Sequence, residues 1–60
     1  MFKIGDRVEK YKGGYQAIGT VVSRFVTLNH VVRYVVEYDV PAGLLHIHSD
    51  GDLRAYRTEA

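Results

Sequence analysis

Two histidines separated by one residue are the most chemically suggestive feature of this sequence. His46 and His48 alternate with Leu45 and Ile47, and successive side chains of a β-strand point to opposite faces. We therefore expect a strand that buries its aliphatic residues and presents both imidazoles on one surface. Such a pair can hydrogen-bond a ligand or coordinate a metal ion.

A metal site would need further ligands beside this pair. Asp50, Asp52 or His30 could supply them, but no second cluster fixes a tetrahedral arrangement. The sequence contains no cysteine, which excludes a cysteine-based zinc site. His46 and His48 are thus weak metal candidates, and a solvent-facing or interface pair is the favoured interpretation.

Nucleophilic and acid–base catalysis have little support from the sequence. Ser23 and Ser49 lack a recognisable base with its orienting partner. Asp50 and Asp52 flank a glycine, and Asp-Gly-Asp is typical of a turn. No residue is predicted with certainty to be catalytic.

The tyrosines are a second group of candidates. They could form an aromatic groove for a peptide or a stacking platform for single-stranded nucleic acid, or they could serve core edges and subunit contacts. Eight Lys and Arg against seven Asp and Glu give a net charge of only +1, which makes nucleic acid the less favoured partner. The tyrosines are Tyr11, Tyr15, Tyr34, Tyr38 and Tyr56.

Length and composition predict one small domain over residues 1–60, with an ordered core at about 3–56. A chain of 60 residues buries only about 60% of its unfolded surface, so its core is marginal. Packing density, a ligand or self-association must support it, and a hydrophobic content of 47% makes self-association worth considering. Because the sequence shows no leader pattern and no membrane-length apolar run, we expect a cytoplasmic protein without a membrane partner.

The distribution of β-branched, aromatic and turn residues predicts strands and no α-helix. Gly19 inside the second expected strand predicts a sharp bend or a close approach. In the third expected strand, valines lie on both faces, and the outer face also carries Arg33 and Glu37. A strand that is apolar on both faces is usually buried on both sides, so we expect a partner subunit to cover the outer face. The expected strands are 7–11, 17–27, 31–39, 44–48 and 54–56. With one 3₁₀ turn before the last strand, this layout predicts an all-β, five-stranded SH3-like barrel.

Four segments of the chain resemble the type II dihydrofolate reductases in order and approximate spacing. They are Gly5-Asp6-Arg7-Val8-x-Lys10, Gly19-Thr20-Val21-Val22, Tyr34-x-Val36-Glu37, and Gly43-x-Leu45-His46-Ile47-His48 followed by Leu53. The resemblance covers about residues 4–54. It implies a relationship to small, plasmid-borne bacterial enzymes that are insensitive to trimethoprim. In that family, SH3-like barrels assemble as homotetramers around one pore, which binds NADPH and dihydrofolate.

The same resemblance implies where a ligand would bind. The family's pore-lining strand, Val-Gln-Ile-Tyr, maps onto Leu45-His46-Ile47-His48, and a lysine near the pore mouth maps onto Lys10. Catalysis in the family rests on holding the nicotinamide of NADPH against the pterin. Here two imidazoles replace an amide and a phenol. The resemblance therefore supports the family's fold for this chain more strongly than it supports the family's activity.

We therefore favour a non-catalytic SH3-like binding module that forms a homo-oligomer or binds a protein or a small anionic ligand. The first alternative is an NADPH-dependent dihydrofolate reductase acting through the pore of a homotetramer. The second is a nucleic-acid-binding SH3-like barrel. The candidate pore or ligand-binding residues are Lys10, Leu45, His46, Ile47 and His48.

Overall fold

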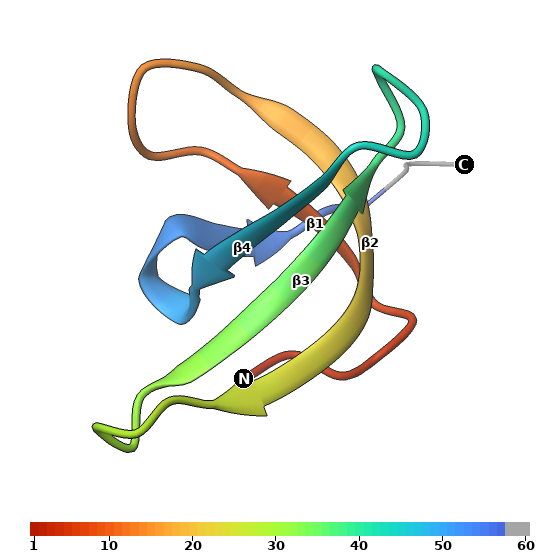
Figure 1. Cartoon of the computed structure of the whole chain (residues 1–60). Helices are drawn as coiled ribbons and strands as arrows, with labels where there is room; N and C mark the ends of the chain where they lie inside the picture. Colours follow the sequence, from red (N-terminus) through yellow and green to blue (C-terminus); the bar gives the residue numbers. More distant parts are fainter. Residues whose placement is uncertain (58–60) are drawn as a thin grey trace.

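The computed structural model describes residues 1–57 and contains one antiparallel sheet of five strands (Figure 1). The elements are β1 (Arg7–Lys10), β2 (Ala17–Val26), β3 (Val32–Tyr38), β4 (Leu45–Ser49), a 3₁₀ turn η1 (Asp50–Asp52) and β5 (Leu53–Ala55). The predicted all-β class and the 3₁₀ turn before the last strand are confirmed. The end of the predicted domain, residues 58–60, lies outside the described residues. Nowhere in residues 1–57 is a helix long and apolar enough to cross a membrane.

The strand order is β4-β3-β2-β1-β5, so β4 and β5 are the two edges of the sheet. The long strand β2 pairs with β1 near its start and with β3 along most of its length. The β2–β3 register shifts between Val21 and Ser23, and such irregularities bend a strand. Figure 1 shows β2 curving from one half of the sheet into the other. No described pairing joins β4 to β5, so closure into an SH3-like barrel stays a prediction.

Gly19 explains how two strands approach each other closely beside this bend. A Cβ atom at Gly19 would overlap the carbonyl oxygen of Glu37 and would lie 2.8 Å from Cγ1 of Val36. Only a residue without a side chain leaves room for β3 at this point. The close approach predicted from the sequence is therefore confirmed.

The core is small and is built mainly on β3. Alternate residues of β3 from Tyr34 to Tyr38 are buried, as the period-2 pattern predicts. Strands β1, β2 and β5 complete the core, and β4 adds no aliphatic side chain to it. The buried hydrophobic residues are Val8, Val21, Tyr34, Val36, Tyr38 and Leu53.

Strand β4 is oriented oppositely to the sequence expectation. His48 is only 6% exposed, whereas Leu45 and Ile47 are 54% and 60% exposed. His48 lies opposite Tyr34 in the β3–β4 register, and residues opposite each other in a ladder share a face. Because Tyr34 points into the core, His48 must do so as well. The expectation that β4 buries its aliphatic side and exposes both imidazoles is wrong.

Candidate functional site

Four aromatic side chains form a continuous series of hydrogen bonds on the core side of β4. His46 Nδ1 lies 3.1 Å from the hydroxyl of Tyr15, which lies 3.2 Å from the hydroxyl of Tyr38. That hydroxyl lies 2.6 Å from Nε2 of His48. We call these four residues the Tyr–His network. It leads from the exposed His46 to the buried His48 and so connects the surface with the interior.

Strand alternation and one loop position the Tyr–His network. Both histidines lie on the same side of β4, Tyr38 ends β3, and Tyr15 belongs to the loop between β1 and β2. The rings of Tyr38 and His48 stack with centroids 5.9 Å apart and 15° between their planes. The two imidazole centroids are 5.6 Å apart. The imidazoles share one face, as predicted, but that face is the core side.

The Tyr–His network has a direction that follows from its protons. Three hydrogen bonds link the four residues, and the two hydroxyl groups supply two protons. The third proton must come from an N–H of His46 or of His48. The hydrogen between His46 and Tyr15 is therefore donated by Nδ1 of His46 in one arrangement and by the Tyr15 hydroxyl in the other.

The buried end of the network is electrically neutral. Burial lowers the pKa of His48, the charges of His46 and Lys10 lower it further, and Asp52 opposes them. Burial also raises the pKa of Tyr38, and its hydrogen bond with Tyr15 raises it further. At neutral pH the pair is thus a phenol beside an uncharged imidazole.

Lys10 holds the loop that carries Tyr15. Its side chain is buried, with the residue 8% exposed, and its ammonium donates to the backbone carbonyl oxygens of Lys12 and Tyr15. The ammonium also lies 4.0 Å from the ring centroid of Tyr15. In a single chain Lys10 therefore secures the loop and does not project into solvent, unlike the pore-mouth lysine that the resemblance implies.

Leu45 and Ile47 lie on the opposite face of β4 from the histidines. Ile47 is opposite Val35 of β3, and Leu45 is opposite Glu37. Val35 is half-buried, whereas Leu45 and Ile47 are exposed. We call Val35, Leu45 and Ile47 the aliphatic patch. The five residues predicted to bind a ligand thus divide between two faces, with Lys10, His46 and His48 on the core side.

The acidic residues after β4 stabilise the fold. Asp52 accepts a hydrogen bond from the hydroxyl of Ser49 at 3.1 Å, and Asp50 accepts one from Tyr34 at 3.3 Å. Within residues 1–57 no three His, Cys, Asp or Glu side chains are arranged to hold a metal ion. The weak metal candidates His46 and His48 therefore lack a third ligand in the described part of the chain.

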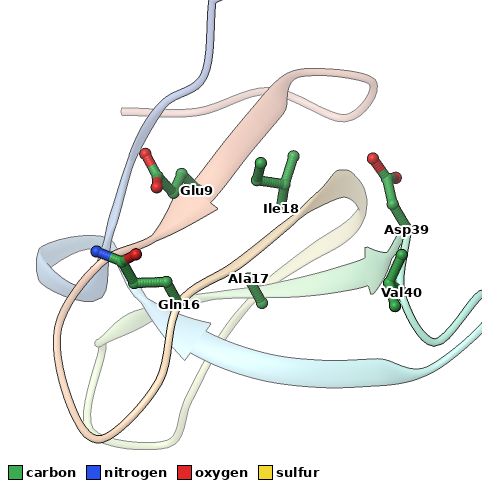
Figure 2. Close-up of a pocket in the computed structure, with 6 residues that line it drawn as sticks. All are labelled: Glu9, Gln16, Ala17, Ile18, Asp39 and Val40. Atoms are coloured by element: carbon green, nitrogen blue, oxygen red, sulfur yellow. The ribbon is translucent and has the colours of Figure 1, made fainter.

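Two open pockets adjoin each other beside the Tyr15 loop. The acidic pocket, of about 430 Å³, is shown in Figure 2 and is lined by Glu9, Gln16, Ala17, Ile18, Asp39 and Val40. The aromatic pocket, of about 340 Å³, is lined by Tyr15, Gln16, Ala17, Tyr38, Val40, Pro41, Leu44 and His46. Both carboxylates of the acidic pocket are ion-paired, Glu9 with Arg54 and Asp39 with Arg7.

Sequence patterns alone did not connect the tyrosines with the histidines. The tyrosines are candidates for an aromatic groove, and Tyr15 and Tyr38 both line the aromatic pocket. The hydrogen bond between Tyr15 and His46 depends on a loop 31 positions away in the sequence, whereas that between Tyr38 and His48 joins the neighbouring strands β3 and β4. No residue pattern predicts the first of these contacts.

No protein-family model and no curated protein matches this sequence. The likeness to the type II dihydrofolate reductases therefore rests on its four sequence segments, and both the family and its chemistry stay predictions.

Proposed function

We propose that this chain is a self-associating, non-catalytic binding module of the SH3-like type, and that two copies pack through the aliphatic patch. One observation carries the proposal. Leu45 and Ile47 are 54% and 60% exposed on an edge strand, directly beside the half-buried Val35. Burying a Leu or Ile side chain completely contributes about 1.5–3 kcal/mol. In a chain with so small a core, covering this patch is a substantial gain.

The charges around the aliphatic patch favour a second copy as the occupant. Arg33 and Glu37 precede and follow Val35 by two residues, so both share its face of β3. An isologous interface pairs the same surface from both subunits. When two such faces meet with their β3 strands antiparallel, Arg33 of one copy lies opposite Glu37 of the other. The parallel alternative would place like charges together.

A dimer interface of ordinary size would cover a large share of this small chain. A standard interface buries roughly 800 Å² on each partner, and the chain exposes 4282 Å² in total. Self-association would thus cover about a fifth of the surface. The outer faces of β3 and β4, together with Phe25 of β2 opposite Arg33, form the contiguous surface on which we place this interface.

Substitution of the aliphatic patch tests the proposal. We expect the wild-type chain to sediment as a dimer or a larger closed oligomer at about 100 µM, and Ile47→Lys to sediment as a monomer. A buried lysine cannot be accommodated without a partner charge. Leu28→Lys is the matched control, because Leu28 is fully exposed at the β2–β3 turn and does not belong to the patch. It should leave the oligomer unchanged.

Two outcomes would reject self-association through this patch. One is a monomeric wild-type protein at 100 µM, and the other is an oligomer that persists in Ile47→Lys. A charge reversal gives a further check. Arg33→Glu alone should weaken the oligomer, and Arg33→Glu combined with Glu37→Arg should restore it.

A reductase is the second candidate function, favoured by one observation. Of the four residues that map onto the pore strand, Leu45, His46 and Ile47 are exposed. The buried His48 and Lys10 weigh against it, because neither is presented to a shared pore. We expect no NADPH oxidation when dihydrofolate and trimethoprim are both present. A tetramer that oxidises NADPH under these conditions would replace the module with the enzyme.

A further inference from the structure

We propose that the aromatic pocket binds a planar apolar molecule that carries a carboxylate, with His46 as the donor to that carboxylate. The site lies between the Tyr15 loop and the start of β4, on the other side of the sheet from the aliphatic patch. It shares no residue with that patch. The inference therefore goes beyond self-association and can fail independently of it.

The shape and lining of the aromatic pocket suit a flat apolar group. Its volume of about 340 Å³ lies at the lower end of the roughly 300–1,000 Å³ found for small-molecule sites. Two tyrosine rings provide aromatic surface for a flat ligand. Most of the remaining wall is aliphatic, from Ala17, Val40, Pro41 and Leu44, and Gln16 also lines the pocket.

His46 supplies a ring nitrogen to the pocket, and a hydrogen bond at its other ring nitrogen orients it. Its Nδ1 is hydrogen-bonded to Tyr15 at 3.1 Å, and its ring lies 5.5 Å from that of Tyr38. Within residues 1–57 its Nε2 makes no hydrogen bond to the protein. When Tyr15 donates to Nδ1, Nε2 carries the hydrogen, and an imidazolium also carries one there. Either form can donate to a carboxylate.

The electrostatics of the two pockets place the anion beside His46. Among the described residues that line the aromatic pocket there is no Asp or Glu, and the ammonium of Lys10 lies 4.0 Å from the Tyr15 ring. The acidic pocket instead presents Glu9 and Asp39, which Figure 2 shows on either side of it. A carboxylate only accepts hydrogen bonds, and the arginine partners of these two are already engaged by them, so this pocket offers an anion no comparable donor.

Benzoate is the probe, and benzamide is its neutral counterpart. In an NMR titration of isotopically labelled protein, benzoate should produce saturable shifts at Ala17, Leu44 and the His46 ring. The dissociation constant should be on the order of 1 mM, typical of a fragment. Benzamide should bind at least about 5-fold more weakly, because it lacks the charge that His46 and Lys10 favour.

Two substitutions separate donation by His46 from its positioning by Tyr15. His46→Phe keeps an aromatic ring but removes the donor, and it should weaken benzoate binding by about 10-fold or more. Tyr15→Phe removes only the hydroxyl, so it should weaken binding less and should also change the ratio of His46 tautomers seen by ¹⁵N NMR. His30→Asn is the matched control at an exposed histidine with φ of 63°, a conformation that asparagine tolerates.

Three results would overturn the aromatic-pocket site. They are absence of saturable shifts up to about 20 mM benzoate, equal affinity for benzamide, and unchanged affinity in His46→Phe. The titration is repeated in Ile47→Lys, whose substitution lies outside the pocket. Binding in that variant supports the pocket whether or not the chain self-associates. Absence of binding in both backgrounds rejects the pocket alone.

Discussion

At the scale of single residues, the burial of His48 has the clearest consequence. Its ring lies against Tyr38 and accepts or donates the shortest hydrogen bond of the Tyr–His network, at 2.6 Å. Burial and the neighbouring positive charges lower its pKa below the ordinary value of 6.5. The folded state therefore binds a proton at His48 less readily than the unfolded state does.

The stability of the fold should consequently depend on pH through His48. Below pH 6.5 the unfolded chain takes up a proton that the folded chain resists, so the free energy of unfolding falls as pH decreases. The slope for one proton is at most about 1.4 kcal/mol per pH unit. The loss ends once pH drops below the folded-state pKa. Urea denaturation between pH 5 and 8 measures it.

His48→Asn should flatten this dependence, because the asparagine amide does not titrate between pH 5 and 8. The quantity to compare is the slope of the free energy of unfolding against pH. The smaller side chain also leaves a cavity in the core, which lowers stability at every pH and so does not change that slope. His30→Asn serves as the control and should keep the wild-type slope. Equal slopes in wild type and His48→Asn would show that His48 does not carry the dependence.

At the scale of elements, the close approach of β2 and β3 depends on Gly19. An added Cβ would meet backbone atoms of Glu37 and a side-chain carbon of Val36, and backbone cannot move aside at low cost. We expect Gly19→Ala to lower the free energy of unfolding by about 1–3 kcal/mol. Denaturation with urea at fixed pH checks this value.

Gly14 provides the comparison for this substitution. It lies in the loop between β1 and β2, and a Cβ there would meet nothing within 4 Å. Gly14→Ala should therefore change the free energy of unfolding by no more than about 0.5 kcal/mol. Should both substitutions have the same small effect, the close approach at Gly19 would not limit the fold.

Strand β4 shows how an element's neighbours decide its role. Its alternation of aliphatic and imidazole side chains is visible in the sequence, but hydrophobicity alone assigned the wrong face to the core. The ladder with β3 sets the orientation, since Tyr34 opposite His48 is completely buried. Tyr38 and Tyr15 then satisfy the buried polar atoms, and no buried side-chain nitrogen or oxygen of residues 1–57 lacks a partner.

At the scale of the whole molecule, the proposed self-association would stabilise a fold that has a small core and an exposed aliphatic patch. Whatever binds only the folded state stabilises it by mass action, a second copy included. We expect the melting temperature of the wild-type chain to rise by about 5 °C or more between 5 and 500 µM. Ile47→Lys should melt at a temperature that does not depend on concentration. Differential scanning fluorimetry on intrinsic tyrosine emission measures both.

The concentration series also distinguishes the two surfaces of the molecule. His46→Phe leaves the aliphatic patch intact and should retain the wild-type concentration dependence. If its melting temperature became independent of concentration, the core side of β4 would take part in assembly. The aromatic pocket would then be an interface and not a site for a small molecule.

The sequence by itself determined the all-β class, the approximate bounds of the strands, the 3₁₀ turn and the close approach of a neighbouring strand at Gly19. These features depend on local alternation, on β-propensity and on glycine, all of which act between near neighbours in the chain. It also placed both imidazoles of β4 on one face. Only the tertiary structure decided that this face is the core side, because the register with β3 outweighs the hydrophobicity of Leu45 and Ile47. It likewise brought Tyr15 to His46, a contact between residues 31 positions apart in the chain.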